Sequence, residues 1–159
     1  MRVVIMGVAG CGKSTVGAAL ARETGIPYRD GDDLHPPENI RKMSKGTPLT
    51  DKDRAPWLAK VGLALKPGNL MIGCSALKRG YRDIIRDQAD GPVLFLHLAA
   101  PIELIRERMK ARTGHFMPPA LLDSQFATLE PLQPDEAGSV IDIDQSFEGV
   151  VTACAQELS

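Results

Sequence analysis

The residues best suited to chemistry form a glycine-rich run near the start of the chain. It reads Gly7-Val8-Ala9-Gly10-Cys11-Gly12-Lys13-Ser14 and matches G-x-x-x-x-G-K-[ST] at every fixed position. Glycines permit backbone conformations that turn successive N–H groups inward, where they form a nest for anions. Lys13 is suited to bridging the β- and γ-phosphates of a nucleotide, and the Ser14 hydroxyl to ligating Mg²⁺. The run therefore predicts a nucleotide-phosphate site rather than a plain glycine-rich turn.

Cys11 lies inside this run and has two interpretations. A helix N-terminus lowers the pKa of a thiol, which would make Cys11 sensitive to oxidation. Alternatively, Cys11 is a small filler of which only the backbone N–H is used. We favour the filler, because a phosphate nest is built from backbone N–H groups.

A second set of candidates is the acidic run Asp30-Gly31-Asp32-Asp33, which follows a short predicted strand at 27–29. The carboxyl ends of adjacent parallel strands converge on the ligand crevice, so Asp30 and Asp32 are expected near the γ-phosphate. One carboxylate could hold a Mg²⁺-bound water while the other accepts a proton from an attacking hydroxyl. Which of the two is the base stays open. A simple turn with a helix cap is the alternative interpretation.

Cationic side chains gather in the segments that follow or connect the predicted strands. An arginine can grip a carboxylate with two parallel hydrogen bonds, which fixes the orientation of an acidic acceptor as well as neutralising it. For any single member of the set, a solvated surface position is the alternative. The candidates are Arg41, Lys42, Arg54, Lys78, Arg79 and Arg82.

An arginine-rich helix is predicted over 102–112. Arg108 and Arg112 are four residues apart and share a helix face, from which they could meet the transferring phosphoryl group on a closing flap. A salt-bridged surface helix is the alternative, because glutamates alternate with the arginines. The tip of the flap is expected at 113–119, where His115 is a weaker candidate than the arginines.

The elements that must position these residues alternate along the chain. Strands are expected at 3–6, 27–29, 70–73, 93–98 and 140–143, and helices at 13–24, from Pro36-Pro37, at 57–65, 102–112 and 147–158. Strands that alternate with helices indicate an α/β fold, in which a five-stranded parallel sheet carries helices on both faces. Continuous apolar runs such as 93–98 fit strands that are covered on both sides.

Length and composition narrow the function classes. With 159 residues the chain is expected to form a single domain, 1–159. Lys plus Arg is 19 and Asp plus Glu is 20, so no general basic field exists to hold nucleic acid. Three widely spaced cysteines argue against disulfides or a zinc site and favour a reducing compartment. No apolar stretch approaches the roughly 20 residues that span a bilayer, so no membrane partner is expected.

Several long blocks of the sequence resemble the gluconate kinases, or gluconokinases, of the P-loop kinase group. The blocks cover nearly the whole chain in order, and Asp-Gly-Asp-Asp-Leu-His-Pro and Cys-Ser-Ala-Leu-Lys are the most particular to that family. Besides the run from Gly7 to Thr15, they begin at Asp30, Asn39, Gly46, Cys74, Gly114, Leu121 and Val140.

The resemblance implies a fold, a reaction and a set of partners. The expected fold is a three-layer P-loop kinase related to shikimate and nucleoside monophosphate kinases, with a small lid at about 112–125. The expected reaction moves the γ-phosphate of ATP to the 6-hydroxyl of D-gluconate, giving 6-phosphogluconate and ADP with Mg²⁺ as cofactor. A cytoplasmic enzyme is implied, and related gluconate kinases suggest a homodimer that no motif here demands.

The resemblance also assigns roles to residues. The catalytic set is Lys13, Asp30, Asp32, Arg108 and Arg112. The nucleotide is expected on Gly7, Val8, Ala9, Gly10, Cys11, Gly12, Lys13, Ser14 and Thr15, with adenine near Asp144 and Gln145. The acceptor is expected on Asp32, His35, Arg54, Lys78, Arg82 and His115, and the metal on Ser14 and Asp30.

Two departures from the family pattern and two alternative functions remain. Between Trp57 and Cys74 the chain is several residues shorter than usual, so the helix after Trp57 is expected to be short or differently placed. Cys11 stands where serine is common, with little effect expected on phosphate binding. The alternatives are a kinase for another hydroxy acid, such as shikimate, and a catalytically inactive nucleotide-binding regulator.

Overall fold

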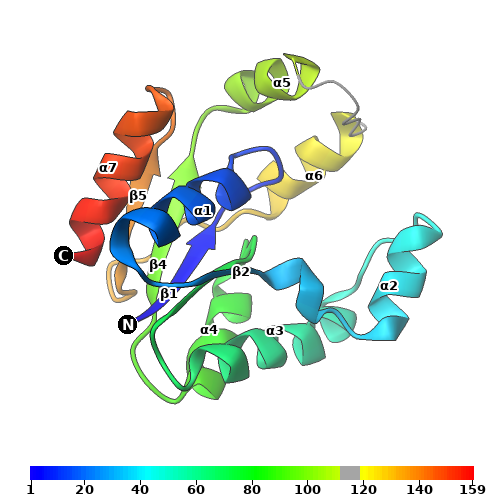
Figure 1. Cartoon of the computed structure of the whole chain (residues 1–159). Helices are drawn as coiled ribbons and strands as arrows, with labels where there is room; N and C mark the ends of the chain where they lie inside the picture. Colours follow the sequence, from blue (N-terminus) through cyan, green and yellow to red (C-terminus); the bar gives the residue numbers. More distant parts are fainter. Residues whose placement is uncertain (112–118) are drawn as a thin grey trace.

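Five parallel strands form one sheet at the centre of the molecule (Figure 1). The computed structural model describes residues 1–111 and 119–159. The strands are paired in the order β2-β3-β1-β4-β5, which confirms the predicted α/β fold with a five-stranded parallel sheet. Their bounds are β1 Arg2–Met6, β2 Tyr28–Asp30, β3 Leu70–Gly73, β4 Leu94–Ala99 and β5 Gly138–Asp142.

Helices cover both faces of this sheet. Alternate side chains of β1 point to opposite sides of the sheet. Val3 and Ile5 pack with α1 (Lys13–Thr24) and α7 (Phe147–Leu158), while Val4 and Met6 pack with α3 (Asp51–Leu65) and α4 (Arg79–Ala89). All four of these side chains are fully buried, which explains why β1 is apolar throughout. The helices are α1 Lys13–Thr24, α2 Pro37–Ser44, α3 Asp51–Leu65, α4 Arg79–Ala89, α5 Ile102–Ala111, α6 Pro119–Thr128 and α7 Phe147–Leu158, with a 3₁₀ turn η1 at Gly31–Leu34.

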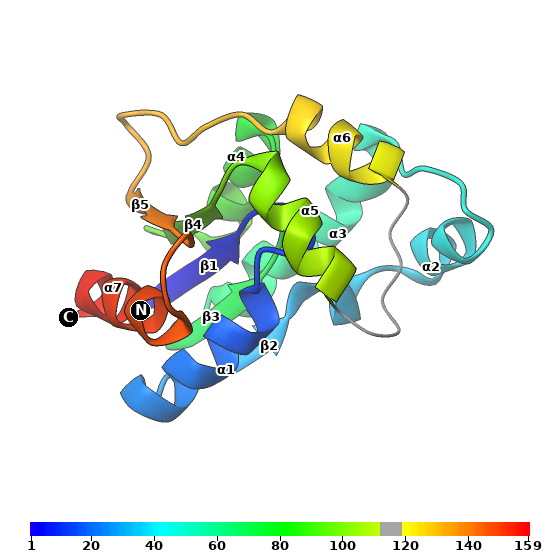
Figure 2. The ribbon, with the colours of Figure 1, turned by 90° about the horizontal axis from the view of Figure 1, so that it is seen from above.

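The remaining helices surround the carboxyl ends of the strands. Seen from above in Figure 2, α5 and α6 lie over this end of the sheet, and α2 stands apart from the sheet on the side of α3. The loop between β1 and α1 opens at the same end (Figure 1). In parallel α/β sheets this is the end at which ligands bind.

The structure differs from the predicted elements in three places. The helix expected at 57–65 begins six residues earlier, at Asp51, because Thr50 and Asp53 form a capping box there. It is therefore 15 residues long and differently placed rather than short. Helices α4 and α6 were not predicted, and residues 119–125 of the expected lid belong to α6. The rest of that lid, 112–118, lies outside the described residues.

Candidate active site

The P-loop, residues 7–14, is shaped for anions. Gly10 and Gly12 have φ values of 83° and 95°, a left-handed conformation that favours glycine, and Gly12 caps the start of α1. The first backbone N–H groups of α1 therefore face the loop with the positive end of the helix dipole. Lys13 folds back over the loop, and its Nζ donates to the carbonyl oxygens of Gly7 and Val8 at 2.9 and 3.1 Å.

Cys11 behaves as a filler of this loop. Its side chain is buried and packs below Gly7, where an added Cβ would stand 2.7 Å from its sulfur. Burial raises the pKa of the Cys11 thiol, with only partial compensation from Lys13, so the thiol stays protonated at neutral pH. The burial and the raised pKa thus favour the interpretation of Cys11 as a filler over that of a reactive thiol.

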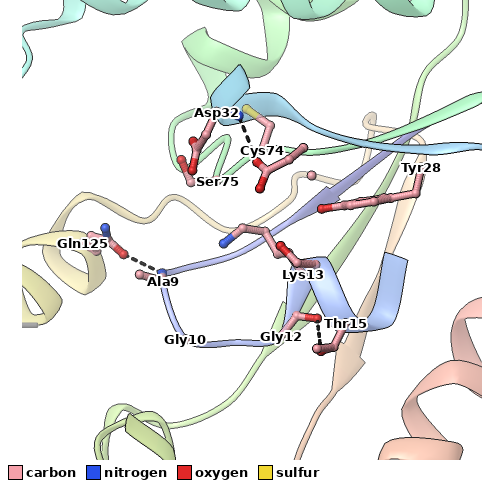
Figure 3. A pocket seen from close by; sticks show the side chains of 13 residues that line it. Ala9, Gly10, Gly12, Lys13, Thr15, Tyr28, Asp32, Cys74, Ser75 and Gln125 are labelled. Carbon is pink, nitrogen blue, oxygen red and sulfur yellow. Dashed lines mark hydrogen bonds between the residues drawn. The ribbon is translucent and has the colours of Figure 1, made fainter. Parts of the chain in front are cut away.

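The P-loop forms one wall of a hollow at the carboxyl end of the sheet, which we name the P-loop hollow (Figure 3). It brings together Lys13, Ser14 and Thr15 with Asp30 and Asp32, as predicted from their positions after β1 and β2. The volume is about 510 Å³, and the further lining residues are Ala9, Gly10, Gly12, Tyr28, Gly73, Cys74, Ser75 and Gln125.

The two aspartates of this hollow differ in their surroundings. Asp30 ends β2 and caps η1, since its Oδ1 accepts a hydrogen bond from the Asp32 N–H at 3.0 Å. The turn-and-cap interpretation is thus confirmed, together with the position in the hollow. Partial desolvation, and then the charge of Asp30, raise the pKa of Asp32, although 81% of its side chain is exposed to solvent. A raised pKa makes a carboxylate a stronger base, which is the property that a proton acceptor needs.

His35 lies behind Asp32 rather than at the surface of the hollow. Its ring stacks on Trp57 with 4.1 Å between the centroids, and Asn39 Nδ2 lies 3.2 Å from its Nδ1. Its Nε2 is 3.9 Å from Asp32 Oδ1. Burial lowers the pKa of His35, so the ring is neutral at pH 7. This arrangement makes His35 a support for Asp32, which differs from its predicted role as a direct acceptor ligand.

A second hollow, the Arg54 hollow, adjoins the first and shares Ser75 and Gln125 with it. Arg54 Nη1 donates to the Leu49 carbonyl at 2.8 Å and to the Tyr81 hydroxyl at 3.3 Å. The volume is about 660 Å³, and the lining residues are Met43, Gly46, Thr47, Pro48, Leu49, Arg54, Ser75, Leu77, Tyr81, Ala120, Leu121, Ser124, Gln125 and Thr128.

Asp51 organises the cations beside this hollow. Its carboxylate accepts from the Tyr81 hydroxyl at 2.5 Å and pairs with Lys78 Nζ at 3.2 Å, with Arg54 Nη1 at 3.7 Å. These hydrogen bonds, from Tyr81 first and then Lys78, lower the pKa of Asp51 and keep it charged. The structure thus brings the predicted Arg54 and Lys78 together at one site.

Arg82 corrects the sequence prediction. It was expected to hold the acceptor, but its side chain is 0% exposed and its Nε donates to Glu136 at 2.7 Å. Three further hydrogen bonds run from Nη2 to Glu136 at 3.0 Å and from Nη1 and Nη2 to the carbonyls of Ala76 and Pro131. Arg82 therefore joins α4 to the segment before β5, and its guanidinium is buried among protein acceptors rather than directed at a ligand.

The other cations of that set are also paired away from the two hollows. Lys42 Nζ donates to both carboxylate oxygens of Asp53, at 3.0 and 2.8 Å. Arg79 forms a two-pronged pair with Asp135. Arg41 is exposed and lies 3.8 Å from Glu38. These contacts favour the surface interpretation for all three residues.

A third and smaller hollow, of about 140 Å³, lies on the other side of the P-loop between α1 and α7. Of the two residues expected near adenine, Gln145 lines this hollow and Asp144 is not among its lining residues. Arg108 lines it too, and its Nη2 donates to the Ile143 carbonyl at 2.6 Å. The structure thus places Arg108 with Gln145 and away from Asp32, which differs from a position beside the transferring phosphate. Arg112 and His115 lie outside the described residues.

The sequence of this chain is similar to those of known kinases. The model of the family described as "Shikimate kinase" matches residues 9–154. The thermosensitive gluconokinase of Escherichia coli strain K12 is 46% identical, over 96% of this chain and 84% of its own length. The gluconokinase of Gluconobacter oxydans is 48% identical, over 84% and 78%. The chain belongs to the gluconokinase family.

A solved structure of a gluconokinase agrees with this membership. A crystal structure of a gluconokinase from Sinorhizobium meliloti 1021 superposes with a TM-score of 0.91 at 47% identity, covering 99% of this chain and 90% of that one. A shikimate kinase from Bacteroides thetaiotaomicron, at a TM-score of 0.66 and 16% identity, shares the fold. None of the helices within residues 1–111 and 119–159 combines the length and apolar character that crossing a membrane requires.

The P-loop hollow of this gluconokinase family member suits Mg²⁺ by the chemistry of its donors. Ser14 and Asp30 supply a hydroxyl and a carboxylate oxygen to the same hollow, and Asp32 a second carboxylate. Mg²⁺ is commonly held by one or two carboxylates together with substrate phosphates and waters, rather than by a cage of protein ligands. In the described part of the chain, no group of three His, Cys, Asp or Glu side chains forms such a cage.

Sequence reasoning missed four residues of the site: Tyr28, Asp51, Tyr81 and Gln125. Gln125 Oε1 accepts from the Ala9 N–H at 2.7 Å across 116 residues of sequence, so no local pattern could reveal the contact. From the sequence, Tyr28 is expected only as part of a short strand. The Thr50-x-x-Asp53 pattern could have revealed the helix start and with it Asp51 and Arg54 on one turn.

Tyr28 fits a slot that two glycines leave open. A Cβ at Gly17 would stand 2.2 Å from the ring, and one at Gly73 would stand 2.0 Å from the hydroxyl. The hydroxyl is buried and has no hydrogen-bond partner among the described residues. Burial raises the pKa of Tyr28 to about 12, so it is a neutral wall of the hollow.

Proposed function

We propose that this protein is an ATP-dependent gluconokinase that transfers the γ-phosphate of ATP to the 6-hydroxyl of D-gluconate. The observation that carries the proposal is the junction of two hollows at Ser75 and Gln125. One hollow has the P-loop and Asp32, and the other has Arg54. A nucleotide in the first and a sugar acid in the second would meet at this junction.

The residues of the two hollows support a direct transfer. The P-loop N–H groups and Lys13 would hold the phosphates of ATP, and Arg54 with Lys78 the carboxylate and hydroxyls of gluconate. Asp32 would accept the proton of the gluconate 6-hydroxyl while the oxygen of that hydroxyl forms a bond to the γ-phosphorus. The bond from that phosphorus to the β,γ-bridging oxygen breaks, and ADP leaves with both electrons of the bond. Arg108 beside Gln145 would contact the adenine side of the nucleotide.

Mg²⁺ is proposed as the cofactor, held by Ser14 and Asp30. When bound it would neutralise charge on the phosphates. The three buried free cysteines fit a reducing compartment such as the cytoplasm. A homodimer, suggested by the family resemblance, is proposed as the assembly.

The test is ADP release with purified protein, ATP and Mg²⁺, in the presence of a panel of sugar acids and shikimate. Gluconate is expected to stimulate ADP release above the rate with ATP alone, and above the rate with every other acid of the panel. Stimulation by shikimate alone would favour the other-acid kinase. A low basal rate that no acid changes would favour a nucleotide-binding regulator.

A further inference from the structure

We propose that Gln125 is a catalytic residue, whose amide nitrogen donates a hydrogen bond to the transferring phosphoryl group while its amide oxygen is held by the P-loop. This inference rests on the proposed function, because it concerns the transfer step between the two hollows. Gln125 belongs to α6, outside the P-loop and outside the acidic run after β2.

The contact with the P-loop fixes the orientation of the amide. The Ala9 N–H donates to the Gln125 side chain at 2.7 Å, and a backbone N–H requires an acceptor opposite it. The amide oxygen must therefore face Ala9, which turns the NH₂ group away from it. In Figure 3 the nitrogen of Gln125 lies on the side of the hollow where Ser75 and Asp32 are seen.

The place of Gln125 matches the place of the reaction. Gln125 lines both the P-loop hollow and the Arg54 hollow, and shares this property only with Ser75 among the described lining residues. The γ-phosphate of a nucleotide on the P-loop and the hydroxyl of an acceptor beside Arg54 must approach each other at this border. A donor at the border can contact the phosphoryl group during its transfer.

Helix α6 is held at both ends of the segment that carries Gln125. Asp123 forms an ion pair with Arg106 of α5. After the helix, the Glu130 N–H donates to the Leu77 carbonyl at 2.7 Å, and Glu130 Oε1 accepts from the Arg79 N–H at 2.7 Å. The amide is thus fixed before substrates bind, which is the condition for a donor to favour the transition state.

The chemistry favours a neutral amide at this point. In phosphoryl transfer, negative charge is spread over the equatorial oxygens of the transferring group, and fixed donors aimed at them lower the barrier. A carboxylate in the same place would keep an acceptor for Ala9 but would present a negative oxygen to the phosphoryl group. A comparison of glutamine with glutamate at position 125 therefore separates the loss of the donor from the loss of the contact with Ala9.

The experiment compares Gln125→Glu and Gln125→Ala with wild type, and uses Gln156→Glu on the exposed side of α7 as the matched charge control. We measure kcat, both KM values, ADP affinity by calorimetry, and the affinity for ADP with aluminium fluoride in the presence of gluconate. Gln125→Glu is expected to lower kcat by about 100-fold, in the range seen when one oxyanion donor is removed. It is expected to weaken the aluminium fluoride complex similarly and to leave ADP affinity within about threefold.

Three outcomes would overturn the proposal. If Gln125→Glu keeps kcat within about threefold of wild type while Gln125→Ala has a much lower kcat, Gln125 acts only by accepting the hydrogen bond of the Ala9 N–H. If neither variant changes kcat, the residue has no role in the reaction. If ADP affinity falls as far as kcat, the substitution has damaged the P-loop. Wild type assayed in parallel separates these results from a failure of the proposed function, which would appear as absent gluconate turnover in wild type itself.

Discussion

Asp32 has the two properties that a proton acceptor needs at this site. It lines the P-loop hollow together with Lys13, and its pKa is raised by desolvation and by neighbouring Asp30. His35, neutral and stacked on Trp57, supports it from behind. Asp30, by contrast, is engaged as the cap of η1. The structure thus separates two aspartates that the sequence leaves equivalent.

Replacing Asp32 by asparagine is expected to lower kcat at least 100-fold, because general base catalysis contributes on the order of 10²–10⁴. The affinity for ATP, measured by calorimetry, is expected to stay within about threefold. Asp33→Asn is the matched control, since Asp33 does not line the P-loop hollow. Equal turnover in Asp32→Asn and wild type would remove Asp32 from the mechanism.

The raised pKa of Asp32 also predicts the pH dependence of turnover. A base must be deprotonated, so kcat is lost as the pH falls through the pKa of Asp32. Because that pKa lies above the ordinary value of 3.8, the acid limb is expected at a pH above that value. The check is kcat measured against pH, with circular dichroism to verify that the fold persists. An acid limb at or below the ordinary value would contradict the assignment.

Arg54 is expected to grip the acceptor and not the nucleotide. Arg54→Ala should raise the KM for gluconate by about tenfold or more and leave the KM for ATP nearly unchanged, because the residue lines only the second hollow. Arg41→Ala, which removes an exposed arginine from α2, is the control. Steady-state kinetics, with gluconate and ATP varied in turn, measures the two KM values. An equal rise in both KM values would count against the role.

At the scale of elements, local patterns predicted most of the fold. Apolar runs located the core strands, and Gly25 ends α1 in a left-handed conformation as expected. The start of α3 was misplaced because the turn-forming composition before Trp57 outweighed the capping box of Thr50 and Asp53. Helix α4 was not predicted, although its buried positions Tyr81, Ile85 and Ala89 recur at the four-residue spacing of an amphipathic helix.

The close approach of α3 and α4 depends on Gly62. A Cβ there would stand 2.6 Å from the Ile85 carbonyl oxygen and 2.7 Å from Gln88 Cβ, so backbone must move. Gly62→Ala is therefore expected to destabilise the protein by about 1–3 kcal/mol, although alanine is the better helix former.

Gly80→Ala in α4 is the control for Gly62→Ala, because its Cβ would meet nothing within 4 Å. That variant is expected to be as stable as wild type or more stable. Urea unfolding of both variants measures the difference. If Gly62→Ala is as stable as Gly80→Ala, the space between α3 and α4 accommodates a Cβ at position 62 and the argument is wrong.

At the scale of the whole molecule, the net charge is near zero, yet the cationic side chains fall into two groups. Some lie at or beside the hollows, and others form ion pairs away from them. Arg54 lines the second hollow and Lys78 pairs with Asp51 beside it, whereas Arg82 is buried and paired with Glu136. The sequence could not separate Arg82 from Arg54, because its partner lies 54 residues further along the chain. Position relative to the strands can be predicted from sequence, but the partner of a charge across the fold cannot.

The Arg82–Glu136 pair predicts a large effect on stability. Glu136→Gln would leave the fully buried Arg82 without a counter-charge, and breaking one side of such a pair costs about 3–5 kcal/mol. Glu107→Gln, which breaks an exposed pair with Lys110, is the control and should cost less than about 1 kcal/mol. Urea unfolding at neutral pH measures the free energy of unfolding of both variants and of wild type. Equal stabilities of the two variants would contradict the burial argument.

The most direct test of the account is the reaction itself. Purified protein is incubated with ATP, Mg²⁺ and either D-gluconate or shikimate, kcat/KM is measured for each, and the position of the new phosphate is read by nuclear magnetic resonance. The account predicts a clear preference for gluconate and a phosphate on its 6-oxygen. No phosphorylation of gluconate above the background, or a phosphate on another oxygen, would contradict it.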